Sequence, residues 1–417
     1  MREDQFAIEI LPEATFGVAP TWTSPAAGGV VSIDLAPTEP PAIADPSQRL
    51  GHNEEDEIVG LVAGVTVPLT RKAESYGTLP STGSAPAHNL ASRILETVFG
   101  RSAELLKRST VKTATTPTTT EIIETTNDGH LSAGVQIVSV NVAAEGAAVY
   151  EEAPATYDAV TDKLTLLFEL SAAPVAGSAD IGGGINHRYL ADPAAPPTIA
   201  MRAYGNADWQ HTLLLGGVAK LEVPELGPAT VPIFSTGIQI ASATHDPSGW
   251  TRPTVDNPLG IIAAGSSVKI GKYGETSFHT PHTYRLAIGV RPGWVHLEDV
   301  PAQSGAAGVA SLGGPAGYIE ITVPRESDPS DVLGGDSCTW EQFWRSLRTG
   351  QRFHIQAILG TTSGRKIGFY LPKAMLMRPS RAAIQGQAAV KLRFVPAAFA
   401  SSDSAAVKAQ EMVCTQL

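Results

Sequence analysis

The chain has 417 residues, of which 43% are hydrophobic, and it contains 40 glycines and 31 prolines. At about 150 residues per domain, this length predicts two or three domains. Thirty lysines and arginines against 41 acidic residues give a net charge of −11, which excludes a protein that grips nucleic acid through clustered cations. With only two cysteines, a disulfide framework and a four-cysteine zinc site are also excluded.

The amino terminus, M-R-E-D-Q-F, is charged and lacks the apolar region of a signal peptide. No apolar run approaches the ~18 residues of a membrane span. We therefore expect a soluble protein made in a reducing cytoplasm, with no membrane partner. Alternating segments rich in threonine and valine outnumber helical patterns, which favours a mainly β fold with small helices.

The first part of the chain predicts an arm followed by a short strand. Residues 1–30 are proline-rich and are expected to form an extended arm, with a turn at E-A-T-F-G-V-A-P-T (Glu13–Thr21). Val30–Leu35 is expected to be a strand. The acidic run Glu54–Glu57 is typical of a solvated face.

A strand-plus-helix pattern follows and later recurs. Leu61–Pro68 alternates with the period of a half-buried strand. Asn89–Gly100 has apolar residues at helical spacing, begins with a capping asparagine and stops at glycine. Gly317–Pro324 and Thr339–Gly350 repeat this plan. The residues predicted to share a face are Ala63, Val65 and Val67, then Ala91, Ile94, Leu95 and Val98, and in the second copy Ile319, Ile321 and Val323, then Trp340, Phe343, Trp344 and Leu347.

A second match supports an internal duplication. Ile199–Pro224 lies against His354–Pro379 at a constant offset of 155 positions (354 − 199), without a gap. Each segment ends in a predicted strand, and a further alternating strand follows each, at Val231–Ile240 and Ala389–Val395. Superposition of the two copies is expected to bring together Val65 and Ile321, Ile94 and Phe343, and Leu221 and Leu376.

Residues 101–195 have no counterpart in the second copy. Short strands are predicted at Val135–Ala143, Ala147–Tyr150 and Lys163–Leu170. Polar tracts flank them, and the glycine-rich Ile181–Asn186 is expected to be a flexible linker. This pattern predicts a small β-module inserted into the first copy.

These patterns together predict six regions. They are an arm (1–30), a first unit (31–100 with 196–243), the inserted module (101–195), a linker (244–283), a second unit (284–400) and a C-terminal tail (401–417).

No segment predicts a catalytic, cofactor or metal site. Gly335–Cys338 is similar to the loop around a nucleophilic serine, but it lacks the second glycine and a partner histidine. His279 and His282 flank Pro281, which prevents a helical His-x-x-His geometry, and no third ligand stands at a suitable spacing. The sequence therefore predicts a protein that is not an enzyme and has no cofactor.

Several short motifs, taken in order, resemble the major tail tube proteins of long, non-contractile-tailed bacteriophages. The motifs are E-A-T-F-G-V-A-P-T, the helix end Leu95–Gly100, the strands Pro197–Met201 and Gly216–Leu221, and the closing strands in Ile367–Pro396. The resemblance covers most of the chain except about 101–195. It implies two β-sandwich, barrel-forming units, each with one short α-helix, and an inserted module that decorates the exterior.

The resemblance also implies a function and partners. The subunit would polymerise as stacked rings into the tail tube, the conduit for DNA ejection. It would be made in the host bacterial cytoplasm and located in the virion. Its partners would be other copies of itself, the tape measure protein, and the tail terminator and distal tail proteins, while genomic DNA would pass through the lumen without specific binding.

The duplication bears on the number of chains in a ring. A bore that passes duplex DNA needs roughly two dozen strands, and the family supplies about four from each of six units. If each chain carries two units, three chains close the ring, so we expect a trimer with pseudo-sixfold symmetry. A hexamer remains open if the second unit packs outside the barrel.

Two other functions fit the same composition. One is a different virion shell component, such as a decoration or head–tail joining protein, which would need no repeated unit. The other is a secreted carbohydrate-binding or hydrolytic β-protein. The missing signal peptide and the absence of paired catalytic carboxylates weigh against the second.

Overall fold

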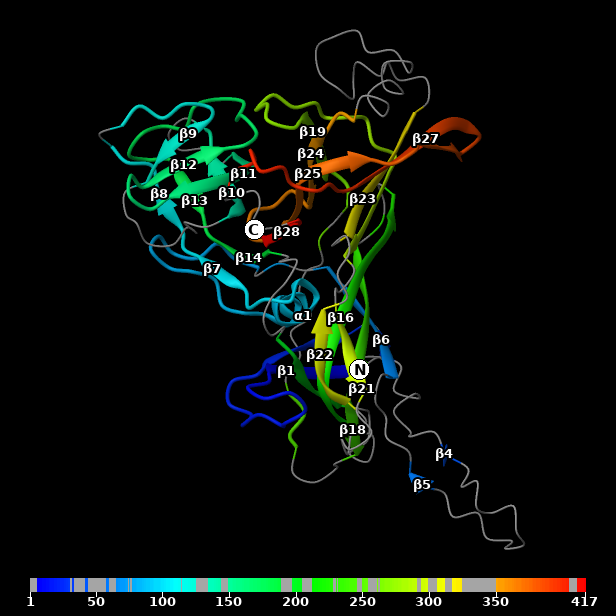
Figure 1. The fold of residues 1–417 in the computed structure, drawn as a ribbon. Coiled ribbons are helices and arrows are strands. Elements are labelled where there is room, and N and C mark those ends of the chain that lie inside the picture. The colour runs from blue at the N-terminus through cyan, green and yellow to red at the C-terminus, as the bar shows by residue number, and fades with distance from the viewer. Residues whose placement is uncertain are drawn as a thin grey trace, which may run out of the picture.

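The computed structural model describes the chain except for residues 1–5, 31, 34–41, 44–57, 60–64, 74, 76, 114, 125–133, 144–148, 189–196, 205–211, 228–229, 231, 246–249, 254–260, 262, 291–293, 299–305, 312–316, 325–349 and 405–410. The described residues form a mainly β protein with 28 strands and one helix, α1 (Figure 1). No helix in this part of the chain is long and apolar enough to cross a membrane.

A ladder of six antiparallel strands, which we call the first ladder, runs in the order β1-β15-β16-β17-β6-β3. Its strands are β1 (Phe6–Pro12), β15 (Ile199–Tyr204), β16 (Thr212–Leu226), β17 (Ile233–Ile240), β6 (Val65–Lys72) and β3 (Ser32–Ile33). The beginning of β16 pairs with β15 and with β18 (Ser242–His245), whereas its end pairs with β17. β16 therefore turns the corner between the two layers of a β-sandwich.

A second ladder has the same order, β19-β24-β25-β27-β23-β20. Its strands are β19 (Ser267–Lys272), β24 (Phe353–Leu359), β25 (Ile367–Leu376), β27 (Gln387–Pro396), β23 (Gly317–Pro324) and β20 (Arg285–Val290). β28 (Val413–Gln416) pairs with β25 over Ile367–Tyr370, and β18 pairs with β16 over Thr212–Leu215, 155 positions earlier. Both β15–β16 and β24–β25 contain a register shift near the start of the pairing.

Both ladders also carry a hairpin at the same place. β4 (Ala42–Ile43) pairs with β5 (Ile58–Val59) between β3 and β6. β21 (Trp294–Glu298) pairs with β22 (Ala306–Ser311) between β20 and β23. The end of β16 pairs with β20, and this junction joins the two ladders into one continuous sheet.

The register within the ladders corrects one predicted correspondence. Stepping across the first ladder from Leu221 leads to Thr236, Leu69 and Ile33; stepping across the second from Leu376 leads to Phe394, Ile319 and Ile288. If Leu221 matches Leu376, Leu69 matches Ile319 at an offset of 250 (319 − 69), whereas Val65 with Ile321 required 256. That predicted pair is therefore wrong by six positions. A strand pattern repeats every two residues, so an even slip leaves the same residues on the same face.

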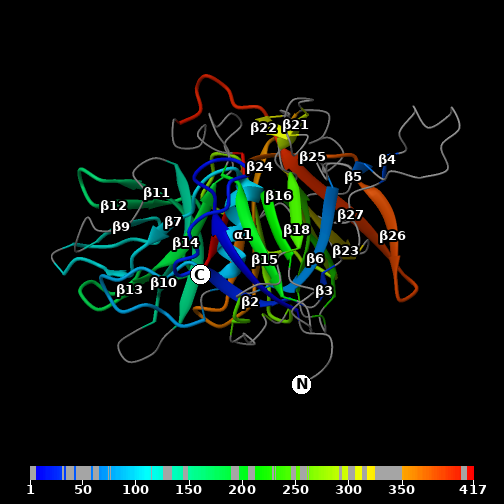
Figure 2. The ribbon, with the colours of Figure 1, turned by 90° about the horizontal axis from the view of Figure 1, so that it is seen from below.

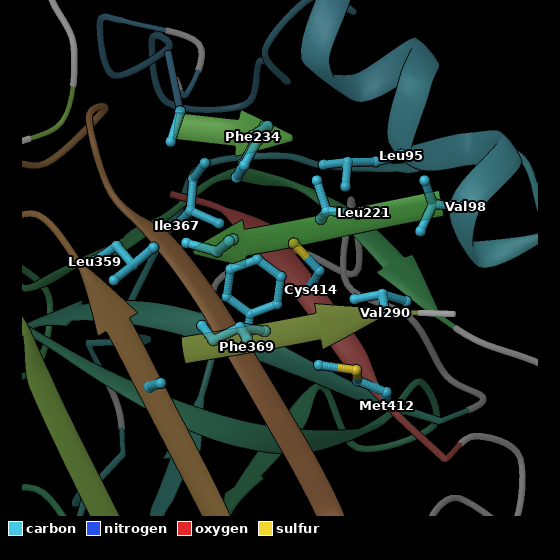
Figure 3. Close-up of a cluster of buried hydrophobic side chains, with 14 of the residues drawn as sticks. Leu95, Val98, Leu221, Phe234, Val290, Leu359, Ile367, Phe369, Met412 and Cys414 are labelled. Atoms are coloured by element: carbon cyan, nitrogen blue, oxygen red, sulfur yellow. The ribbon is translucent and has the colours of Figure 1, made fainter. Parts of the chain in front are cut away.

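The first predicted helix is confirmed as α1 (Leu90–Phe99). The Asn89 side chain accepts a bond from the Ser92 N–H, and Gly100 ends the helix with φ of 69°. Ala91, Ile94, Leu95 and Val98 are all buried. Figure 3 shows Leu95 and Val98 facing Leu221 of β16 within the shared core.

The second predicted helix, Thr339–Gly350, lies outside the described residues except for Gly350, and so does the pairing of Ile94 with Phe343. The run Glu54–Glu57 also lies outside them.

β6 continues past Pro68, which was expected to close the strand. Pro68 has no N–H to donate. Among the described residues, β3 lies opposite only Leu69 and Thr70 of β6, so no described residue of β3 loses a hydrogen bond at Pro68.

The regions predicted as an arm, a linker and a tail each contain strands. The predicted arm contains β1, which pairs with β15, and β2 (Ala26–Val30), which pairs with β1. The predicted linker 244–283 contains β19, and the predicted tail contains β28. β2 and β28 lack a clear polar–apolar alternation, and β19 alternates over only four residues, so pairing with other strands places them.

The inserted module is a six-stranded sheet in the order β8-β13-β10-β11-β12-β9. Its strands are β8 (Ser109–Thr110), β13 (Asp180–Gly182), β10 (Val135–Asn141), β11 (Tyr150–Asp158), β12 (Lys163–Leu166) and β9 (Glu121–Ile123). A bridge between Val111 and Glu124 connects the ends of β8 and β9, so the sheet closes on itself around its own core. Figures 1 and 2 show the module on the side of the molecule opposite the hairpin of β26 (Ser380–Ile384) and β27.

The expected flexible linker Ile181–Asn186 is instead two buried strand segments. β14 (Gly184–Arg188) pairs with β7 (Glu104–Leu106) and with β28, so β7 and β14 belong to the main sheet. A Cβ on Gly183 would lie 2.5 Å from the carbonyl oxygen of Leu106. The glycines therefore allow close backbone packing. The module connects to the main sheet through two adjacent segments of the chain, β7 and β14.

Candidate functional site

The histidines singled out in the sequence do not form a site. His279 exchanges two backbone hydrogen bonds with Ile270, and the His282 ring lies edge-on to Tyr284 with a centroid distance of 5.3 Å. Gly335–Cys338 lies outside the described residues. Over the described ranges, no group of three or more histidine, cysteine, aspartate or glutamate side chains could hold a metal ion.

The motif E-A-T-F-G contacts the motif G-G-V-A at the start of the β16 corner. The Glu13 carboxylate accepts hydrogen bonds from the Gly216 N–H (2.7 Å), the Thr198 hydroxyl (2.7 Å) and the Gly17 N–H (3.0 Å). Burial nevertheless raises the pKa of Glu13, and the three donors offset part of that rise. The Phe16 ring lies beside Gly216, whose φ is +68°. Two motifs about 200 residues apart therefore form one structural unit.

The inserted module is seated on the second ladder by a buried ion pair. Lys366 Nζ lies 2.5 Å from Glu152 Oε1, and both side chains are almost completely buried. The Ser139 hydroxyl donates to the same carboxylate, and Lys269 Nζ donates to the Glu152 carbonyl at 3.1 Å. Because removal of one partner would leave a buried charge alone, this contact fixes the module against the second ladder.

An aromatic cluster lies beside that ion pair. Phe168 of the module packs on His354 of β24 with a centroid distance of 4.2 Å, and His354 Nδ1 lies 2.9 Å from the Tyr370 hydroxyl. Burial lowers the pKa of His354 to about 4. The imidazole is therefore neutral at pH 7 and packs as an aromatic side chain.

The continuous sheet has one apolar and one polar face around its centre. Ile288, Ile319 and Phe394 point into the core. On the opposite face, the Arg393 guanidinium stacks on Tyr318 at 3.6 Å, and Lys391 lies 3.5 Å from Glu320. Because charges of both signs are interleaved here, the described residues of this face form no continuous cationic surface.

Within the continuous sheet, the run of eight strands β3-β6-β17-β16-β20-β23-β27-β25/β26 has no described partner strand at either end, and elsewhere in the sheet β2 and β18 also pair with one described strand only. At one end, β3 pairs only with β6 among the described strands. At the other end, the chain from Leu376 through β26 pairs with β27 on one side only. Such edges present unpaired backbone groups and are sites where another chain can add a strand.

No site residue was predicted from the sequence, and the contacts that organise these surfaces were not predicted either. The adjacency of Glu13 and Gly216 had a signal, because both lie in motifs quoted for the resemblance. The pair Glu152 and Lys366 had none, since neither residue stands out in its segment.

Comparison with known proteins does not assign this chain to a family. No protein-family model matches the sequence, and no curated protein matches it.

Proposed function

We propose that this chain is a structural subunit of the tail tube of a long, non-contractile-tailed bacteriophage. In this proposal the subunits polymerise as stacked rings, located in the virion, that form the conduit for DNA ejection. The observation that carries it is the pair of ladders with one strand order, joined through β16 and β20 into a run of eight strands that has no described partner strand at either end. A tube wall needs such a sheet, because edges that meet between neighbours close a barrel.

The contact between Glu13 and Gly216 is a second support. The resemblance to tail tube proteins rests on short motifs, and two of them form a single hydrogen-bonded corner. A chance resemblance would give no reason for these motifs to meet.

The proposal assigns the polar face of the sheet to the lumen. The core and α1 cover the other face, so among the described residues the face with Tyr318, Glu320, Lys391 and Arg393 is the one available. Its mixed charges suit a channel through which DNA slides, because tight phosphate binding needs clustered cations. This is a structural role without catalysis. The tape measure protein inside the tube, and the terminator and distal tail proteins at its ends, are the further partners.

The proposed ring contains three chains. Each chain supplies eight strands of the continuous sheet to the proposed tube wall: β3, β6, β17, β16, β20, β23, β27 and the β25–β26 segment. Three copies give the roughly two dozen strands that a DNA-sized bore needs. The inserted module lies away from both edges (Figure 2), as a decoration on the tube exterior would.

Electron microscopy of the purified full-length chain tests this function. We expect hollow polymers with a regular axial repeat and a continuous bore. Dispersed particles at all protein concentrations would contradict the proposal and favour a decoration or joining protein.

A further inference from the structure

The junction between the two ladders shows how this sheet adds a further unit. In the junction, Val223 of β16 lies opposite Ile288 of β20. β20 is the outer strand of the second ladder, and its place in the first ladder belongs to β3. The register makes this correspondence specific, because Ile33 and Ile288 occupy the same position three strands from Leu221 and Leu376.

The partner position for β3 lies at the other end of the sheet. The offset of 155 that relates β16 to β25 carries Val223 to Arg378 (223 + 155). The Met377 N–H donates to the Arg393 carbonyl of β27 at 2.8 Å. Because backbone groups alternate sides along a strand, those of the adjacent Leu376 and Arg378 face away from β27. No described strand pairs with them there.

The surface beside this edge also favours an occupant. Met375 and Met377 are 37% and 44% exposed, although methionine is usually buried. Neighbouring exposed apolar side chains at an unpaired edge are typical of a contact surface.

We propose that β3 (Ser32–Ile33) of one chain pairs antiparallel with the edge at Arg378 and Pro379 of a second copy, with Ile33 opposite Arg378. This contact repeats, between chains, the junction that β16 and β20 form within one chain. In the run of eight strands, the described residues leave one edge of each kind, so copies add head to tail. The inference rests on the proposed function only in that both require self-assembly.

Paired cysteines test the register. We would combine Ile33→Cys with Arg378→Cys in a Cys338→Ser background, where the remaining Cys414 is fully buried. Directly opposite residues of an antiparallel pair have Cα atoms about 4.5–5.5 Å apart, within the range a disulfide spans. Mild oxidation of assembled protein should give species of two and three chain masses on a non-reducing gel.

Two control pairs calibrate this result. Val223→Cys with Ile288→Cys should form a disulfide within one chain, because the internal junction is already paired. Ile33→Cys with Met377→Cys places the second cysteine on the other face of the strand and should cross-link at least tenfold less.

A second variant tests the same contact without cross-linking. Arg378→Pro removes an N–H that faces the edge and leaves the Met377 bond to β27 in place. We expect loss of polymers in sedimentation, with an unchanged far-UV circular dichroism spectrum.

The outcomes separate the two proposals. If the unmodified chain forms no polymers, the proposed function fails. If polymers form, the internal control cross-links and the Ile33–Arg378 pair does not, the docking register is wrong and the proposed function stands.

Discussion

At the residue scale, a few side chains join segments that are distant in sequence. Glu13 ties the amino-terminal loop to the β16 corner, and Lys366 ties the second ladder to the inserted module. Both are charged residues in mostly buried settings, where hydrogen bonds offset the cost of desolvation. The burial of Lys366 could not be predicted from the sequence, because a charged residue gives no local sign that a distant partner buries it.

Two glycines with nearly equal φ offer a matched test of the corner. Gly216 has φ of +68°, and an added Cβ would lie 2.6 Å from Ala241 Cβ and 3.0 Å from the Phe16 ring. Gly17 has φ of +70° with nothing within 4 Å. We expect Gly17→Ala to cost about 1–2 kcal/mol of unfolding free energy from backbone strain alone. Gly216→Ala adds overpacking and should cost roughly 2–5 kcal/mol.

Urea unfolding of both variants measures this difference. Equal costs would mean that the contact of Phe16 and Ala241 with Gly216 does not constrain the corner.

His354 predicts a pH dependence of stability. Its pKa is about 4 in the folded protein and ~6.5 in an unfolded chain. Above pH 6.5 both states leave the imidazole neutral, so this group contributes no pH dependence. Between pH 6.5 and 4 only the unfolded chain binds the proton, so the free energy of unfolding falls as the pH is lowered.

The variant His354→Gln cannot titrate and should lose this component. We expect its stability to fall less steeply from pH 6.5 to pH 4.5, by up to about 1.4 kcal/mol per pH unit. The measurement is denaturant unfolding of both proteins across this range. His187, also buried with a lowered pKa, is present in both and cancels in the comparison. Parallel pH profiles would exclude His354 as the cause.

At the scale of elements, the clarity of the local sequence pattern determined which helices and strands could be predicted. α1 was predictable to within a residue, because its cap, apolar face and terminal glycine all agree. β23 and β27 were predictable for the same reason, since each alternates clearly. β19 and β28 were not, because their positions depend on pairing with β24 and β25.

Excision of the inserted module is the test at this scale. Residues 109–182 can be replaced by a short glycine linker, because Arg108 N and Gly183 lie side by side, and β7 and β14 stay in the main sheet. We expect polymers with an unchanged inner bore, since the module lies away from both sheet edges. The melting temperature should fall, because the module covers Ile358, Tyr370 and Val413.

Cryo-EM of the excised chain measures the bore, and calorimetry measures the melting temperature. A narrowed or lost channel would contradict the exterior position. Excision also removes Glu152 and leaves the charge of Lys366 without its partner, which lowers the stability further. Lys366→Met in the excised chain removes this charge and should restore part of the lost stability.

At the scale of the whole molecule, the repeated strand order is the main result. The constant offset of 155 predicted the correspondence of β16 with β25. The stretch of β16 that pairs with β18 and the stretch of β25 that pairs with β28 are related by that same offset. The offset between β6 and β23 could not be predicted, because strand alternation does not distinguish even slips. The edges were also beyond sequence reasoning, since an edge is defined by the absence of a neighbouring strand.

The number of chains in one ring tests the central claim most directly. Two ladders per chain, joined through β16 and β20, predict that three chains supply about two dozen strands. Cryo-EM of the assembled polymer, with native mass spectrometry of released rings, counts the chains. We expect three chains per ring with pseudo-sixfold density in the wall. Six chains per ring, with the second ladder outside the barrel, would contradict the account.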